Sequence, residues 1–139
     1  MKALTLYEPH AMLVAIDAKK NESRSWGTSY RGPLAIHAAK QWPSWAKLLL
    51  LRERFRSVLL PMNLHYPEAL PLGAIVATCV LVECWKIGVD SQYLILSDQE
   101  RAFGDYSLGR FMWMLSNIKR VDPPIPARGK QRLWEWDEG

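Results

Sequence analysis

The chain has 139 residues, the length of one ordinary domain, and 49% of them are apolar while 23% are charged. This balance argues against intrinsic disorder, and no apolar run approaches the roughly 20 residues that span a bilayer. Eighteen Lys and Arg against fourteen Asp and Glu give a net charge of +4, which permits an anionic partner without establishing one.

Residues 2–7 alternate polar and apolar side chains and predict a strand. Pro9 suits the first turn of a helix that residues 11–18 continue. Residues 20–26 are polar and poor in helix formers, which favours an extended segment. After a turn, the apolar residues 34–38 predict a short buried strand.

The clearest predicted helix covers residues 44–60, because apolar side chains recur there at three- and four-residue spacing. The predicted buried stripe consists of Trp45, Leu48, Leu51, Phe55, Val58 and Leu59. A linker with three prolines follows at residues 61–71.

The second half of the chain reads mainly as strand. Residues 74–84 are apolar on both faces, as in a central strand, and residues 97–100 look like a capped helical turn. Residues 110–121 predict a long strand and residues 122–129 a proline-rich turn. Residues 131–136 predict the last strand.

Basic residues concentrate in the first 60 residues, which hold ten Lys and Arg against four Asp and Glu. This segment therefore carries a charge of +6, and the remaining residues carry −2. Basic groups gathered on one face would favour a phosphate-bearing ligand, whereas groups spread over the surface would form an ordinary solvated exterior. Composition by itself leaves both arrangements open.

The cysteines and histidines are few and poorly spaced for disulfide or metal chemistry. Cys79 and Cys84 lie five residues apart in one predicted strand, so their side chains point to opposite faces. With only three histidines besides, no metal-ligand cluster is visible, and we expect neither a metal nor a cofactor. The N-terminus shows no signal-peptide core, so we expect a cytoplasmic protein without a membrane segment.

Three charged residues form the most informative cluster. If residues 20–26 are extended, Glu22 and Arg24 point to the same face, and Lys19 sits at the mouth of that strand. An ammonium, a carboxylate and a guanidinium in mutual reach can shift pKa values, bind an anion or polarise an amide. The alternative is a purely structural ion pair on the rim of a barrel.

This cluster resembles the signature of the ASCH domains, Gly-x-Lys-x-x-Glu-x-Arg, a branch of the PUA-like β-barrels. Lys19, Glu22 and Arg24 match the signature, and Asp17 stands where the family has glycine. Without glycine's freedom at positive φ, Asp17 is expected to reposition that turn.

The resemblance runs nearly from end to end of the chain. Residues 24–39 are similar to the second and third strands of the family, and residues 104–113 and 126–134 to its later blocks. It implies an α+β fold: a single PUA-like β-barrel of the ASCH type over residues 1–139, with two or three helices, one of them in an insertion at about residues 40–70.

The family resemblance implies RNA- or nucleotide-related roles of three classes. Some relatives are amidohydrolases of N4-acetylcytidine that use a lysine, a threonine and a later glutamate, others cleave single-stranded RNA, and others bind nucleic acid without chemistry. Lys19 matches the lysine, but Glu22 occupies the place of the threonine hydroxyl. In the hydrolase interpretation Lys19 acts as base or orients the amide, Glu22 activates a water, Glu100 protonates the leaving amine, and Arg24 holds Glu22 or an oxyanion.

In the binding interpretation, the partner is RNA or a modified nucleoside. Trp26 or Tyr30 would stack on an unpaired base, as in single-stranded RNA readers. Phosphate contacts would come from basic side chains of the first half: Arg24, Arg31, Lys40, Arg52, Arg54 and Arg56.

Four further side chains are candidates for the ligand pocket. Tyr7 replaces a tryptophan in a segment that borders the pocket in the family, where Glu8 and His10 are also departures. His37 lies in an apolar run and is interpreted as a core or pocket-edge histidine, because no Ser or Cys nucleophile pairs with it by spacing. Tyr106 and Arg110 either cover a ligand or pin a turn.

The remaining assignments concern turn chemistry and the tryptophans. Arg128 and Gly129 are interpreted as part of a turn after Pro126. Among the seven tryptophans, Trp26 is the one expected in the pocket because it shares a face with Arg24. Three others fall in predicted strands and favour core packing: Trp113, Trp134 and Trp136.

Overall fold

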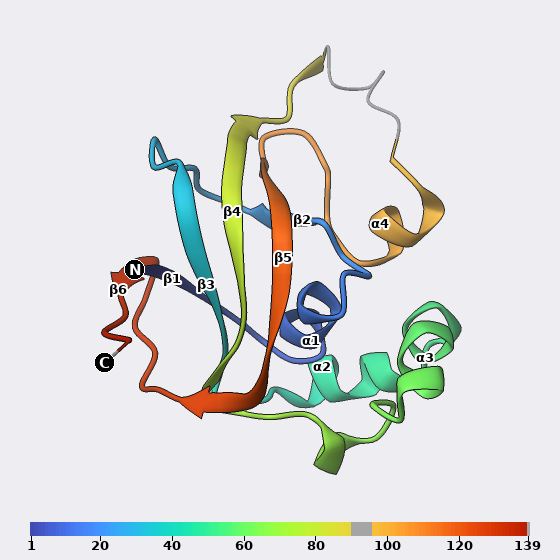
Figure 1. The fold of residues 1–139 in the computed structure, drawn as a ribbon. Helices are drawn as coiled ribbons and strands as arrows, with labels where there is room; N and C mark the ends of the chain where they lie inside the picture. Colours follow the sequence, from blue (N-terminus) through green and yellow to red (C-terminus); the bar gives the residue numbers. More distant parts are fainter. Residues whose placement is uncertain (90–95, 139) are drawn as a thin grey trace.

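A six-stranded sheet forms the centre of the computed structural model, which describes residues 1–89 and 96–138 (Figure 1). The strands lie in the order β2-β5-β4-β3-β1-β6, with β1 and β3 parallel and the other neighbouring pairs antiparallel. The strands are β1 Lys2–Leu6, β2 Asn21–Arg24, β3 Gly32–Ala38, β4 Ala74–Lys86, β5 Phe111–Pro126 and β6 Leu133–Glu135.

The helices are short and gather on the side of the sheet away from β6 (Figure 1). They are α1 His10–Ala15, α2 Ser44–Lys47, α3 Glu53–Leu59 and α4 Asp98–Ala102. Three turns of 3-10 helix lie at Leu48–Leu51, Leu60–Met62 and Pro67–Ala69. The α+β class predicted from the sequence is confirmed. No helix of the described residues has the length and apolar character needed to cross a membrane.

Side chains alternate between the two faces of each strand, and the buried apolar residues form two separate clusters. Leu4 and Leu6 of β1 belong to a large cluster that includes the buried side chains of α1. Ala3, on the opposite face of the same strand, packs with Trp134 and Trp136 in a second, smaller cluster. The predicted core roles of Trp113, Trp134 and Trp136 are confirmed, since all three are buried.

The prediction of one helix over residues 44–60 is wrong. Arg52 is extended, with φ −77° and ψ 137°, and separates the 3-10 turn of four leucines from α3. The extended residue changes the direction of residues 44–51 relative to α3. The apolar side chains of the predicted helix therefore do not form one buried face. Trp45, Leu48 and Leu51 are 58%, 60% and 73% exposed, whereas Phe55 and Leu59 are buried.

The prediction of a turn over residues 122–129 is also wrong in its first half, because β5 continues to Pro126. Ala77 pairs with Arg120 and Ile75 pairs with Ile125, so residues 121–124 form an irregular stretch between two regular pairings. Prolines cannot donate to a sheet ladder, but a bulge of this kind tolerates them. The strand therefore reaches Ile125 in spite of the prolines.

Several boundaries agree with the sequence to within a few residues. The extended segment predicted at 20–26 is β2, and the predicted central strand at 74–84 is β4, which runs two residues longer. The capped turn at residues 97–100 begins α4, where the Ser97 hydroxyl accepts a hydrogen bond from the Glu100 N–H at 3.1 Å. The predicted last strand is shorter, at Leu133–Glu135.

Glu8, one of the departures noted above, is fully buried at the start of α1. Its Oε1 atom accepts a hydrogen bond from the Met12 N–H at 2.8 Å, and its Oε2 atom has no hydrogen-bond partner among the described residues. Burial raises the pKa of this carboxyl to about 8, although the bond from Met12 opposes the shift. Glu8 is therefore protonated in the folded protein at neutral pH.

The raised pKa of Glu8 predicts a loss of stability with rising pH. Because the carboxyl is harder to ionise in the folded state, its contribution is fully present below pH 4.5 and is lost as the pH rises to about 8. Between pH 5 and 8 we expect a loss on the order of 3 kcal/mol, measured by urea unfolding. Glu8→Gln should remove this dependence, and equal pH slopes for the two proteins would contradict the assignment.

Candidate functional site

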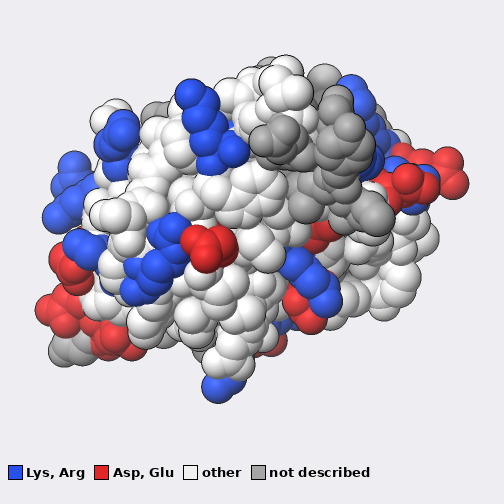
Figure 2. All heavy atoms as spheres, turned by 90° about the horizontal axis from the view of Figure 1, so that it is seen from above, with Lys and Arg blue, Asp and Glu red and all other residues white. Residues whose placement is uncertain are grey.

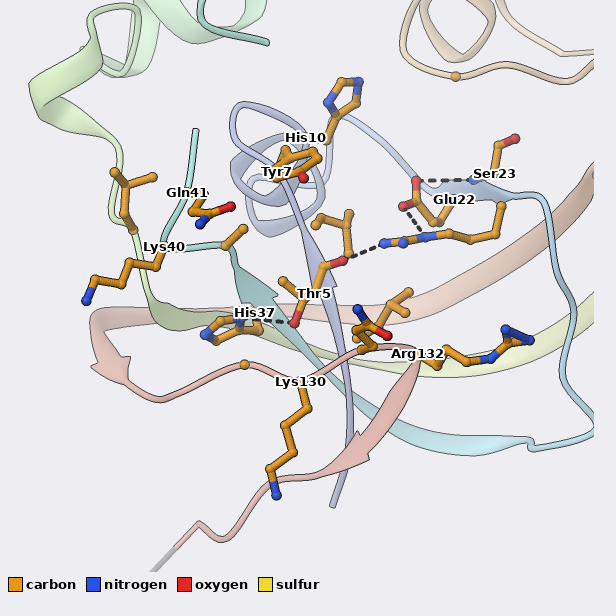
Figure 3. A pocket seen from close by; sticks show the side chains of 18 of the residues that line it. Thr5, Tyr7, His10, Glu22, Ser23, His37, Lys40, Gln41, Lys130 and Arg132 are labelled. Atoms are coloured by element: carbon orange, nitrogen blue, oxygen red, sulfur yellow. Dashed lines mark hydrogen bonds and ion pairs between the residues drawn. The ribbon is translucent and has the colours of Figure 1, made fainter. Parts of the chain in front are cut away.

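A broad open pocket of about 1690 Å³ lies where β1, β2 and the end of β3 meet the segments 102–105 and 126–132 (Figure 3). Thr5 and Tyr7 enter it from β1 and its end, His10 from α1, and Glu22 and Arg24 from β2. The pocket is thus built from segments that are far apart in the sequence and that the sheet brings together.

The charged cluster predicted from the signature is assembled at the inner wall of this pocket. The Lys19 ammonium is fully buried, donates to the Asn21 carbonyl, and lies 3.2 Å from Glu22 Oε1. Arg24 Nε donates to Glu22 Oε2 at 3.1 Å, and Arg24 Nη2 donates to the Thr5 carbonyl at 2.5 Å (Figure 3). The cluster therefore joins β2 to β1 as well as neutralising a buried carboxylate.

The neighbouring cations set the protonation of the cluster. Burial by itself raises the pKa of Glu22, but the positive charges of Lys19 and Arg24 more than offset it and lower the pKa to about 2. Burial and, after it, the nearby Lys19 charge together lower the pKa of His10 to about 4. At neutral pH Glu22 is ionised and accepts hydrogen bonds only, whereas His10 is uncharged.

Asp17 precedes this cluster in the position where the family has glycine. Its φ of 64° lies in the left-handed region, which Asp and Asn tolerate better than other residues with a side chain. The turn therefore keeps a conformation that suits glycine, and the Asp17 carboxylate lies at the surface, 3.8 Å from the Lys20 ammonium.

The structure separates the candidate residues into those that line the pocket and those that do not. Lining residues among them are Tyr7, Glu22, Arg24, Trp26, His37 and Arg110. Lys19, Glu100 and Tyr106 lie outside the pocket lining: Glu100 accepts from the Lys20 N–H at 2.5 Å and from the Tyr106 hydroxyl at 3.2 Å. Burial, followed by the Glu100 charge, raises the pKa of Tyr106.

Tyr30 and Arg31 lie outside the pocket lining, at the start of β3. The Tyr30 hydroxyl donates to the Pro33 carbonyl, and Arg31 Nη2 donates to Glu83 Oε1 at 2.9 Å across to β4. The hydrogen bond from Arg31 lowers the pKa of Glu83. Both side chains serve local contacts in this structure.

His37 and Thr5 form part of the pocket floor (Figure 3). A carbonyl only accepts, so His37 Nε2 carries the hydrogen that bonds to the Ala127 carbonyl at 2.7 Å. The other ring nitrogen, Nδ1, then accepts from the Thr5 hydroxyl at 3.1 Å, and Trp134 Nε1 donates to Thr5 Oγ1 at 3.1 Å. Burial lowers the pKa of His37.

The segment 127–132, which we call the basic loop, supplies pocket residues that sequence reasoning missed. Arg128, Lys130 and Arg132 are exposed and line the pocket, and the Arg132 guanidinium lies 4.5 Å from the centre of the Trp26 ring. The available signal was a basic residue at every second position from 128 to 132. The net charge of residues 61–139 is −2, so charge balance along the chain does not single out this segment.

Basic side chains elsewhere do not form a second concentrated patch on the face seen in Figure 2. There, Lys and Arg are spread among uncharged residues, with Asp and Glu close to several of them. Arg54 of α3 lies 3.8 Å from Asp98, and the helix face that carries it does not line the pocket. Within the described residues, no group of three or more His, Cys, Asp and Glu side chains is placed to hold a metal ion.

The chain is similar in sequence to a small part of two longer proteins. No family model matches the sequence. Activating signal cointegrator 1 of Mus musculus and of Homo sapiens are each 25% identical over 134 residues, which cover 96% of this chain. The matched region is 22% of each of those proteins, so the chain spans about a fifth of their length.

Solved structures of similar shape include an ASCH protein and two of its point mutants. The ASCH protein of Zymomonas mobilis superposes with a TM-score of 0.58 at 11% identity, covering 99% of this chain and 87% of its own. Two point mutants of that protein superpose with TM-scores of 0.56. At such low identity the agreement concerns the fold.

The buried ion pair predicts a large stability loss on removing its acid. Glu22→Gln leaves the Lys19 ammonium buried without a counter-ion, so we expect the free energy of unfolding at pH 7 to fall by about 3 kcal/mol. Glu83→Gln, which breaks the exposed pair with Arg31, is the matched control and should cost less than about 1 kcal/mol. Similar losses for the two variants in urea unfolding would contradict the assignment.

The buried ion pair of Glu22 with Lys19 also predicts how the stability of the protein changes with pH. Because the folded pKa of Glu22 is lowered to about 2, its stabilisation is present above pH 4.5 and is lost as the pH falls toward 2. The wild-type protein should therefore lose stability over this range more steeply than Glu22→Gln, as followed by unfolding midpoints. Parallel curves would show that Glu22 is not the titrating group.

Proposed function

We propose that this chain, which has the fold of the ASCH domains, binds single-stranded RNA by taking an unpaired base into the pocket. The observation that carries the proposal is the excess of basic over acidic side chains in the pocket lining. Only Glu22 and Asp105 are acidic among the lining residues, whereas six are basic: Arg24, Lys40, Arg110, Arg128, Lys130 and Arg132.

The two acidic side chains do not cancel this charge. Glu22 is already compensated by Lys19 and Arg24, and Asp105 Oδ2 lies 3.6 Å from Arg110 Nε. The remaining lining cations give the pocket a positive potential, which attracts an anionic ligand and raises its rate of association. A polyanion such as RNA fits this potential better than a neutral small molecule.

Aromatic rings beside the cations supply the surfaces that unpaired bases need. Trp26 is held edge-on against the buried Trp113, with ring centres 4.9 Å apart. Tyr7, which also lines the pocket, contacts the exposed Trp45 edge-on, with ring centres 6.0 Å apart. Single-stranded RNA is recognised mainly by stacking of splayed bases on such rings, whereas a duplex keeps its bases stacked internally.

The hydrolase alternative, with N4-acylated cytidine or single-stranded RNA as substrate, has less support. Of the three residues assigned to catalysis, only Glu22 lines the pocket, while Lys19 and Glu100 do not. A carboxylate with a pKa of about 2 is a weak general base at neutral pH. Catalytic roles for Lys19, Glu22 and Glu100 therefore stay predictions. Turnover of N4-acetylcytidine that is lost in a folded Lys19→Ala or Glu100→Gln variant would favour them.

The binding proposal predicts that pocket aromatics contribute to affinity. Tyr7→Leu should weaken binding of a labelled single-stranded oligoribonucleotide by about 5-fold or more, since stacking is worth about 1–3 kcal/mol per base. Tyr66→Leu is a matched control, because Tyr66 is exposed to 38% against 41% for Tyr7 and does not line the pocket. Fluorescence anisotropy gives both affinities. Equal effects, or tighter binding of duplex RNA, would contradict the proposal.

A further inference from the structure

The basic loop has the properties of a phosphate-binding segment. Its cations Arg128, Lys130 and Arg132 alternate along the chain and are exposed, and all three line the pocket. Lys40, which follows β3, is exposed and lines the same pocket. In Figure 3 the side chains of Lys40, Lys130 and Arg132 extend outward around the His37–Thr5 pair.

These four cations differ from the other basic residues of the pocket in having no counter-ion among the residues that the structure describes. Arg24 is paired with Glu22, and Arg110 lies beside Asp105. In residues 1–89 and 96–138, by contrast, no carboxylate forms an ion pair with the following cations: Lys40, Arg128, Lys130 and Arg132. Their charge is available to an external anion, and binding a phosphate there breaks no internal ion pair.

Arg132 lies at the C-terminal end of the basic loop, where we expect a base to stack. Its guanidinium covers the face of the Trp26 ring at 4.5 Å, and Trp26 is itself fixed by Trp113. A guanidinium plane stacked on an indole is a surface on which a nucleobase can stack in turn. Arg128 and Lys130, nearer the start of the loop, have no ring contact among the described residues and are free to meet phosphate oxygens.

We propose that the basic loop and Lys40 form the phosphate-binding part of this pocket: a nucleotide of the bound strand places its base at Arg132 and Trp26 and its phosphates at Lys40, Arg128 and Lys130. This inference rests on the proposed function and deepens it by assigning the base and phosphate contacts to named residues. A free nucleoside would leave the phosphate contacts unmade and would bind weakly.

The pocket floor holds the basic loop in place. The Ala127 carbonyl accepts from His37, and the Ala127 N–H donates to the Gly73 carbonyl at 3.0 Å. Gly129 lies directly on the floor, because a Cβ atom there would be 2.6 Å from His37 Cε1 and 2.9 Å from Thr5 Oγ1. Only glycine permits this close approach, so Gly129 is a positioning residue for the cations on either side of it.

The first test removes the loop's charge. We compare Arg128→Ala/Lys130→Ala with Lys119→Ala/Arg120→Ala, which makes the same charge change at exposed β5 positions outside the pocket. Affinity for a labelled oligoribonucleotide is measured over a salt series. The loop variant should bind at least 10-fold more weakly at low salt, and its slope of log K against log salt should be shallower by about 0.7 per lost contact. An unchanged slope, or an equal loss in the control, overturns the proposal.

The second test displaces the loop without changing any charge. Gly129→Ala should weaken binding and flatten the salt dependence, because the added methyl group pushes the loop off His37. Gly88→Ala is the matched control, since a Cβ atom at Gly88 would have none of the described residues within 4 Å. Wild-type affinity and slope in a folded Gly129→Ala protein would overturn the positioning role.

The third test identifies the ligand class with a nucleoside, its monophosphate, a short single-stranded RNA and inorganic polyphosphate as probes. We expect affinity to rise from nucleoside to monophosphate to RNA, and RNA to bind more tightly than polyphosphate of equal charge. Equal affinity for nucleoside and monophosphate overturns the phosphate assignment, and equal affinity for RNA and polyphosphate overturns the base assignment. If the wild-type protein binds none of the probes, the proposed function itself fails, which distinguishes that case from failure of the loop alone.

Discussion

The buried Lys19 ammonium and its two oxygen partners are the constraint on which the rest of the site depends. Removing an ammonium from water is costly unless its charge and hydrogen-bonding capacity are satisfied nearby. The Glu22 carboxylate and the Asn21 carbonyl supply both, and these two partners lie on β2, the next element after α1. Arg24 completes the arrangement by bonding to Glu22 and to the Thr5 carbonyl, which ties β2 to β1.

The pocket and the buried wall behind it consequently hold two kinds of positive charge. Lys19 and Arg24 are used internally, because they compensate Glu22 and hold two strands together. The cations of the basic loop are held from below by uncharged contacts, namely the His37 hydrogen bond and the close packing of Gly129. This division explains how one pocket combines a rigid, neutralised wall with a rim whose charge is available to a ligand.

The sequence predicted most strands correctly because alternation of polar and apolar side chains reports directly which faces are buried. The prediction from sequence was wrong where the local residue pattern favours one backbone conformation and the folded chain has another. The leucines of residues 48–51 satisfy a helical stripe, but extended Arg52 changes the phase of that stripe and leaves Leu48 and Leu51 in solvent. The prolines near residue 123 are typical of a turn, yet β5 absorbs them in an irregular stretch and continues.

What the sequence by itself determined is the charged cluster: Glu22 and Arg24 lie two positions apart in an extended segment and so share a face, and Lys19 lies just before that segment. The place of the basic loop in the pocket was decided only by the tertiary structure. Arg132 meets Trp26, and Ala127 meets His37, because the pairing of β1 with β3 and β6 folds the two ends of the chain onto one another. Such contacts follow from long-range strand pairing, which spacing along the chain does not encode.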